Sequence, residues 1–268
     1  ETAGKLYHNV AELAADTPRY FGDSTYDFTD DFNVTHLTGV LASTEWAAPP
    51  EDMTGLKTIQ NNTLVGFKDN IVYISEPSQP HAWPEAYQKT FDANIVAIEP
   101  ISGIGTLVLT TKYPYLISGV DPRIMSVQRV DAQYPCSSSR GVVPMSFGVV
   151  WPTFEGLAMY GANGPRLIST GVFEQDTWST ELDPTTVLGV YYGDAYFGAT
   201  SAGSFIFTAE AQGVGSFVNC DQSFTAVYND TTTDRVYFAN DLVGTVYEWD
   251  SLTQPTQTLT WKSKVFVA

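Results

Sequence analysis

The chain has 268 residues, of which 43% are hydrophobic and only 16% are charged. Its 30 acidic and 13 basic residues give a formal net charge of −17. This excess of negative charge, with no cluster of Lys or Arg, excludes proteins that hold nucleic acid or anionic membranes on a basic surface. No apolar run reaches the roughly 18 residues of a membrane-spanning helix, so no membrane span is expected.

Residues 1–55 are expected to form an N-terminal segment, which serves either as a docking element or as the first strands of the fold. Residues 9–16 are its one helical candidate, with Asn9 as the N-cap and Pro18 after the last turn. Residues 25–41 alternate between apolar and polar side chains, as a strand, a turn and a second strand would.

The most distinctive stretch begins with a β-hairpin. Residues 63–67 and 71–74 are apolar runs rich in β-branched and aromatic side chains, and the turn Lys68-Asp69-Asn70 separates them. A connection rich in proline and aromatic residues follows. The residues that we single out in it are Glu76, Pro77, Pro80, His81, Trp83, Pro84 and Tyr87.

Short strands recur through the rest of the chain. The turns expected at Asp69, Tyr113, Asn163, Asp194 and Asn240 stand 44, 50, 31 and 46 residues apart. A unit near 45 residues with about four short strands is typical of a β-propeller blade. The expected strands after the hairpin are 95–98, 106–111, 115–118, 127–130, 142–145, 149–151, 157–160, 166–169, 187–192, 195–199, 204–208, 216–218, 224–228, 235–238, 245–249 and 258–267.

We therefore predict an all-β, β-propeller-like domain over residues 56–268, with four or five blades of about 45 residues. A short helix at residues 172–182, carrying Trp178, is expected to interrupt it, in addition to the N-terminal helix. The chain starts without Met and ends on a strand-like segment that no turn follows. We expect a piece of a longer polypeptide, in which the propeller domain is truncated at its C-terminal end.

No motif for catalysis, metal binding or cofactor binding is found. His81 lies among aromatic residues, but no nucleophile elbow or oxyanion loop accompanies it, so we expect His81 and Trp83 to anchor the connection to the sheet. The three histidines are isolated and show no metal-ligand spacing. Cys136 and Cys220 are compatible with either one disulfide or two buried thiols.

Several strings occur together in a pattern that resembles a family of tailed-bacteriophage virion proteins. The first set is Tyr73, Glu76, Pro77, Pro80, His81, Ala82, Trp83, Pro84 and Tyr87. Further strings follow in the same order, at residues 107–110, 113–119, 121–122, 136–140, 155–157, 172–173, 178, 247–249 and, with Trp261 at its start, 261–264. The resemblance covers residues 56–267, and its nearest analogy is the nozzle or tubular tail protein of short-tailed phages.

The resemblance implies a virion protein of the phage tail that is structural and not an enzyme. Its partners would be copies of itself in a ring, other tail or portal-proximal virion proteins, and double-stranded DNA that passes during ejection without tight binding. The family has no catalytic residues to carry over. An acidic wall would suit such a channel, because it keeps DNA mobile.

A second interpretation stays open beside it. A carbohydrate-recognising propeller, either a host receptor-binding tail adhesin or a glycosidase, would stack sugars on exposed aromatic side chains. The candidates for such stacking are Trp46, Trp83, Trp151 and Trp178.

Overall fold

The computed structural model describes residues 47–172, 175–200, 203–208, 216–220, 224–230, 232–233, 235–240, 244–249 and 251. These residues fall into two units, which we describe separately. Unit 1 contains the described residues up to Asp92 together with 119–126, and unit 2 contains 93–118 and the described residues from Val127 onward.

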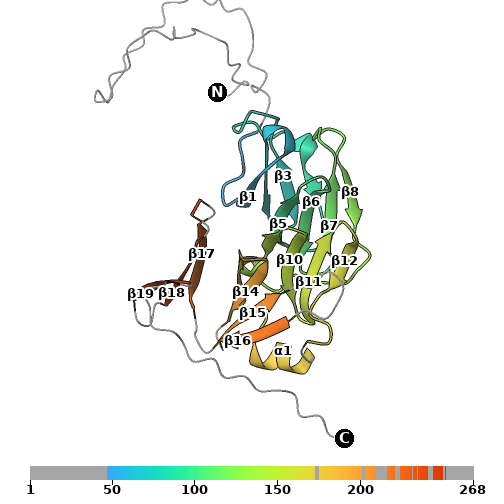
Figure 1. Ribbon diagram of the computed structural model, residues 1–268. Coiled ribbons are helices and arrows are strands. Elements are labelled where there is room, and N and C mark those ends of the chain that lie inside the picture. Colours follow the sequence, from blue (N-terminus) through green and yellow to red (C-terminus); the bar gives the residue numbers. More distant parts are fainter. Residues whose placement is uncertain are drawn as a thin grey trace, which may run out of the picture. The chain divides into compact units, whose positions relative to one another are not determined.

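Five antiparallel sheets follow one another along the chain, and within each sheet the strands are neighbours in chain order (Figure 1). Sheet 1 contains β1 (Thr54–Ile59), β2 (Thr63–Lys68), β3 (Ile71–Ile74) and β4 (Lys89–Thr90). Sheet 2 contains β5 (Ile95–Ile101), β6 (Gly105–Thr110), β7 (Tyr115–Ser118) and β8 (Ser126–Arg129). Sheet 3 contains β9 (Val143–Met145), β10 (Gly148–Thr153), β11 (Gly156–Gly161) and β12 (Gly164–Leu167).

Sheet 4 contains β13 (Leu188–Tyr192), β14 (Ala195–Ala199), β15 (Ser204–Thr208) and β16 (Ser216–Cys220). In the described residues, sheet 5 contains three strands: β17 (Ala226–Asp230), β18 (Arg235–Asn240) and β19 (Thr245–Glu248). Helix in the described part is limited to α1 (Gln175–Glu181) and the 3-10 turns η3 (Gln60–Asn62), η4 (Glu85–Tyr87) and η5 (Ser139–Gly141).

The repeat has the length that the sequence predicted. The first strands of the five sheets begin at Thr54, Ile95, Val143, Leu188 and Ala226, so successive sheets start 41, 48, 45 and 38 residues apart. A series of small antiparallel sheets of this period confirms the all-β, β-propeller-like fold.

The irregular turn spacing read from the sequence has a simple structural cause. Asp69 and Tyr113 lie between the second and third strands of their sheets, whereas Asn163 joins a third strand to a fourth and Asp194 joins a first strand to a second. The 31-residue interval between Asn163 and Asp194 therefore compares turns that are not equivalent. The regular period is therefore found by comparing equivalent strands of the sheets, and not by comparing turns of similar composition.

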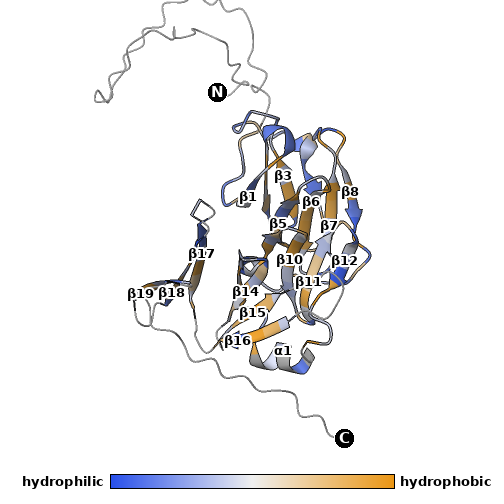
Figure 2. Cartoon of the chain, in the orientation of Figure 1, coloured by the Kyte–Doolittle hydropathy of each residue, from blue (hydrophilic) through white to orange (hydrophobic). Residues whose placement is uncertain are grey.

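Within unit 2 each sheet packs its apolar face on the next one. Sheets 2 and 3 share a cluster that includes Leu107 and Trp151, and sheets 3 and 4 share another that includes Val150 and Phe205. Sheets 4 and 5 meet at a third cluster, where the rings of Phe197 and Phe238 lie 6.2 Å apart. Strand β8, by contrast, is exposed along its length and is hydrophilic apart from Val127 (Figure 2).

Helix α1 lies within the range predicted for an interrupting helix and packs on this core through Trp178. The indole is fully buried, and its Nε1–H donates a hydrogen bond to the Thr153 carbonyl at 2.7 Å. The Trp178 ring also meets Phe205 edge-on at 5.8 Å. One side chain thus fixes the helix to the end of β10 and to sheet 4.

Cys136 and Cys220 do not form a disulfide, and of the two buried thiols that the sequence also allowed, only Cys136 is buried, while Cys220 is half-buried. Cys136 is buried, and its burial raises the pKa of the thiol to about 12. In the described residues, no helix is long and apolar enough to cross a membrane. The predicted helix at 9–16, the strands within 25–41 and the strand with Trp261 lie outside the described residues.

Replacing Trp178 with Ala is expected to lower the free energy of unfolding by about 3–5 kcal/mol, because it leaves a cavity between α1 and sheets 3 and 4. Trp178→Phe keeps most of the volume but leaves the Thr153 carbonyl without its donor, so a smaller loss of about 1–3 kcal/mol is expected. Phe154→Ala, at a position that is 50% exposed, is the control. Denaturant titration followed by circular dichroism measures all three, and equal losses for Trp178→Ala and Phe154→Ala would contradict the anchoring role.

Candidate functional site

The residues singled out in the sequence lie together in unit 1, in the connection between β3 and β4. The backbone of this connection folds back on itself. Glu76 N–H donates to the Ala82 carbonyl at 2.9 Å, while Gln79 and Ala82 N–H donate at 3.1 Å to the Glu76 and Gln79 carbonyls. The connection therefore satisfies many of its own peptide groups, as a partly buried loop must.

The start of the connection is also fastened to strand β2. The Ser75 and Leu64 backbones are linked by a hydrogen bond from Ser75 N–H to the Leu64 carbonyl at 2.9 Å, and Leu64 N–H donates in return to Ser75 Oγ at 2.8 Å. Ser78 N–H donates to the Asn62 carbonyl at 3.0 Å. Because Ser75 is fully buried, its two bonds with Leu64 form away from competing water, whereas Ser78 and Asn62 are exposed.

Trp83 is the buried anchor of the connection. Its side chain is only 3% exposed, and its Nε1–H donates to the Pro80 carbonyl at 2.9 Å. Its backbone N–H donates to the Ala47 carbonyl at 2.9 Å. His81, which we expected to share this role, is exposed. The structure therefore assigns the anchoring to Trp83 and places the imidazole at the surface.

A hydrogen bond between Tyr87 and Glu76 joins the two ends of the connection. The Tyr87 hydroxyl donates to Glu76 Oε2 at 2.6 Å, and the Tyr87 ring is buried. Burial of the phenol, together with the adjacent carboxylate, raises the pKa of Tyr87 to about 12. Pro84 precedes the 3-10 turn η4 that presents Tyr87, and its carbonyl accepts Tyr87 N–H at 3.0 Å.

Two further prolines of the connection, Pro77 and Pro80, restrict its backbone. Pro77 is half-buried and Pro80 is exposed, so their rings contribute mainly by fixing the backbone dihedral φ. In the described residues, no group of three or more His, Cys, Asp or Glu side chains is arranged to hold a metal ion. The connection thus holds a buried Trp and a Tyr–Glu pair in place, and its contacts are those of a structural element.

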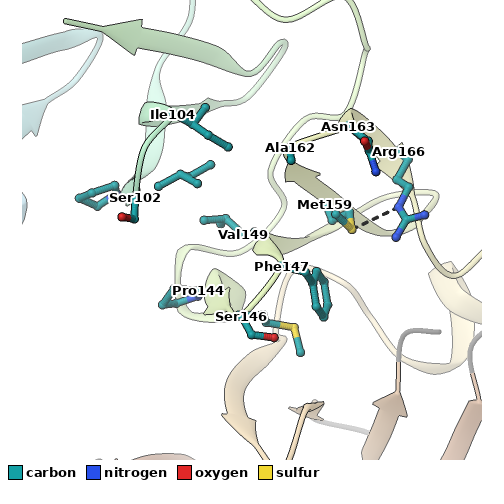
Figure 3. A pocket seen from close by; sticks show the side chains of 14 residues that line it. Ser102, Ile104, Pro144, Ser146, Phe147, Val149, Met159, Ala162, Asn163 and Arg166 are labelled. Atoms are coloured by element: carbon teal, nitrogen blue, oxygen red, sulfur yellow. Dashed lines mark hydrogen bonds between the residues drawn. The ribbon is translucent and has the colours of Figure 1, made fainter. Parts of the chain in front are cut away.

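Unit 2 contains a hollow of about 670 Å³ that no sequence motif pointed to. Three turns line it: β5–β6, β9–β10 and β11–β12. First-to-second and third-to-fourth turns lie at the same end of an antiparallel meander, which explains why residues so far apart in sequence meet here. In Figure 3, Ser102 and Ile104 lie on one side of the hollow, and Met159, Asn163 and Arg166 lie on the other.

The lining of the hollow is mainly apolar, with a single charged group. Arg166 supplies that charge, and its Nε–H donates to the Met159 sulfur at 3.3 Å (Figure 3). Ser102, Ser146 and Asn163 are the polar members, and no carboxylate lines the hollow. The apolar members are Pro100, Ile101, Ile104, Pro144, Met145, Phe147, Val149, Met159 and Ala162.

Two glycines allow the turns around the hollow to approach closely. A Cβ at Gly148 would overlap the Tyr160 carbonyl oxygen, and one at Gly161 would overlap the Phe147 carbonyl oxygen. The backbone at Gly148 also has φ +149°, which L-residues rarely adopt. The hollow therefore depends on glycine at the start of β10 and at the end of β11.

No protein-family model matches this chain, and no curated protein matches it significantly. Among solved structures, the chain is similar to a catalytically inactive variant of virginiamycin B lyase from Staphylococcus aureus with quinupristin. The TM-score is 0.47 with 9% sequence identity, and the match covers 78% of this chain and 74% of that chain. For YCF48 from Cyanidioschyzon merolae, the TM-score is 0.47 with 12% identity over 72% and 66% of the chains.

BamB from Moraxella catarrhalis is a third similar structure, with a TM-score of 0.41, 14% identity, and coverage of 71% of this chain and 62% of that one. These likenesses are too distant to say what the chain does. The assignment of its fold rests on the order and packing of its own sheets.

Trp83→Ala is expected to destabilise unit 1 by about 3–5 kcal/mol, because it removes a buried indole and its hydrogen bond to Pro80. His81→Ala, two residues away, is the matched control, and a change within about 0.5 kcal/mol is expected for this exposed side chain. Thermal and denaturant unfolding measure both. A large loss for His81→Ala would show that the imidazole anchors the connection after all.

The raised pKa of Tyr87 predicts a stability loss in alkali. An unfolded tyrosine ionises near about pH 10, whereas folded Tyr87 keeps its proton to about pH 12. Between these values the folded chain binds more protons than the unfolded chain, so stability falls as pH rises. The stability advantage of the wild type over Tyr87→Phe is therefore expected to be full below pH 10 and to shrink up to about pH 12. Denaturant midpoints at several pH values measure it, and a constant difference would contradict the pairing.

Proposed function

We propose that this chain is a structural subunit of a bacteriophage tail, one copy of a ring or nozzle around the channel used in DNA ejection. The observation that carries the proposal is the combination of a strongly acidic chain with bases that are held by local partners. The connection at residues 76–87, which carries the resemblance to tail proteins, supports it by having structural contacts only.

Basic side chains in the described residues are mostly held by nearby groups. Arg140 donates to the Thr225 carbonyl at 3.0 Å, and the Arg129 guanidinium lies 4.9 Å from the centre of the Tyr113 ring. Each guanidinium keeps its charge in such a contact, but its side chain is engaged locally, whereas phosphate binding requires several free Lys or Arg along one surface. Ion pairs in the described residues include Lys68–Asp52 at 3.8 Å, Arg123–Asp121 at 2.9 Å and Arg235–Glu248 at 2.8 Å.

A surface of this kind suits a DNA conduit. DNA that moves through a ring during ejection is slowed by each phosphate contact, so a wall of negative charge keeps it mobile. The chain's net charge of −17 and the local ion pairs of its bases support this proposal.

The carbohydrate-binding alternative finds less support. Of the aromatic residues considered for sugar stacking, Trp83 is 3% exposed and both Trp151 and Trp178 are fully buried. Trp46 lies outside the described residues. The hollow in unit 2 has no carboxylate in its lining, whereas glycoside hydrolysis uses a pair of them.

The assembly part of the proposal is tested by electron microscopy of the purified full chain, with light scattering to give the mass. Closed rings of several copies are the expected result. A chain that stays monomeric at all concentrations, or one that hydrolyses an oligosaccharide, would overturn the proposal.

The DNA part is tested separately, by fluorescence anisotropy of a labelled duplex mixed with the full chain at physiological salt. We expect binding weaker than a dissociation constant of about 10⁻⁴ M, which is the weak end of non-specific DNA binding. Tighter binding that falls steeply with added salt would show a basic surface and contradict a low-friction channel.

A further inference from the structure

The hollow in unit 2 combines apolar walls with one cation, and this combination indicates what chemistry a ligand of the hollow needs. A volume of about 670 Å³ is large enough for one or two aromatic side chains. The guanidinium of Arg166 stands at its edge and is suited to a carboxylate, which it can bind through two parallel hydrogen bonds. The matching chemistry is therefore aromatic and acidic together.

Arg166 is the charged residue in the lining of the hollow. Arg123 and Arg235 each form an ion pair with a carboxylate, whereas Arg140 donates to a backbone carbonyl and Arg129 lies over the Tyr113 ring. In the part of the chain that the structure describes, Arg166 has no carboxylate within ion-pair distance, and the hydrogen bond it makes is to a weak acceptor, the Met159 sulfur. Among the described residues, Arg166 therefore lacks a carboxylate, which is the strongest kind of partner for a guanidinium.

The chain itself contains a segment with the matching chemistry. Residues 20–32, YFGDSTYDFTDDF, contain five aromatic and four acidic side chains, and no Lys or Arg occurs between Arg19 and Lys57. The segment lies outside the described residues, 15 positions before Ala47. Its aromatic rings suit the apolar walls, and its carboxylates suit Arg166.

We propose that residues 20–32 of one copy dock into the hollow at Arg166 of a second copy of this chain. The segment and the hollow are different surfaces of the chain, so the contact is head-to-tail, and repeated contacts of this kind close into a ring where the rotation between neighbouring copies allows closure. The inference rests on the proposed ring assembly. It adds the surface and the segment through which neighbouring subunits are joined.

Binding of a fluorescent peptide of residues 20–32 to the full chain tests the docking directly. Arg166→Glu is expected to weaken binding by at least about tenfold, because it replaces the attractive charge with a repulsive one. Lys112→Glu is the matched control: it makes the same charge reversal at an exposed site on the β6–β7 turn, at the opposite end of sheet 2, and less than about a twofold change is expected.

Two peptide variants separate charge recognition from general hydrophobic binding. A peptide with its four Asp residues changed to Asn is expected to bind wild-type protein at least about fivefold more weakly. A peptide with the same positions changed to Lys is expected to regain affinity for Arg166→Glu protein. No binding of the original peptide, or equal binding to wild-type and Arg166→Glu protein, overturns the docking.

The oligomeric state of the same samples distinguishes this inference from the proposed function. Loss of rings in Arg166→Glu but not in Lys112→Glu supports both. Rings that persist unchanged in Arg166→Glu overturn the docking and leave the ring standing. A chain that is monomeric yet binds the peptide through Arg166 supports the docking surface and overturns the ring.

Discussion

Inner strands that are buried on both faces are the constraint on which unit 2 depends. Every residue of β10 and of β14 is buried, although each strand belongs to a sheet of only four strands. A sheet of this size cannot cover both of its own faces, so each needs the next sheet in the chain. The apolar clusters between successive sheets are therefore the main source of stability, and α1 adds Trp178 to one of them.

This constraint also decides where variation is possible. Since the sheet faces are occupied by packing, chemistry is restricted to the turns and to the connections between sheets. Both candidate sites obey this rule: the connection between β3 and β4 carries the buried Trp83, and the hollow is made by three turns at one end of sheets 2 and 3. The first site stabilises its own unit, while the second is an apolar hollow with the exposed Arg166 at its edge.

Much of the fold could be predicted from sequence because short local patterns determine the strands and the helix. Apolar runs with β-branched residues gave the strands on either side of Asp69, and a short amphipathic stretch before Pro184 gave the helix around Trp178. The exposure of His81 could not be predicted, because an aromatic neighbourhood in sequence does not say which ring faces the core. The hollow was missed for a similar reason, since Ile104, Phe147 and Arg166 meet only once two sheets have packed.

The distribution of charge links the candidate sites to the proposed function. Among the described residues, Lys68, Arg123 and Arg235 pair with carboxylates, in a chain with 30 acids for 13 bases. No carboxylate lines the hollow at Arg166, so this guanidinium has no such partner among the described residues. Arg166 is exposed at the edge of an apolar hollow, so under the proposed docking it would attract the acidic and aromatic segment of a neighbouring copy. Under the proposed function, the excess of negative charge in the chain would at the same time keep DNA from binding.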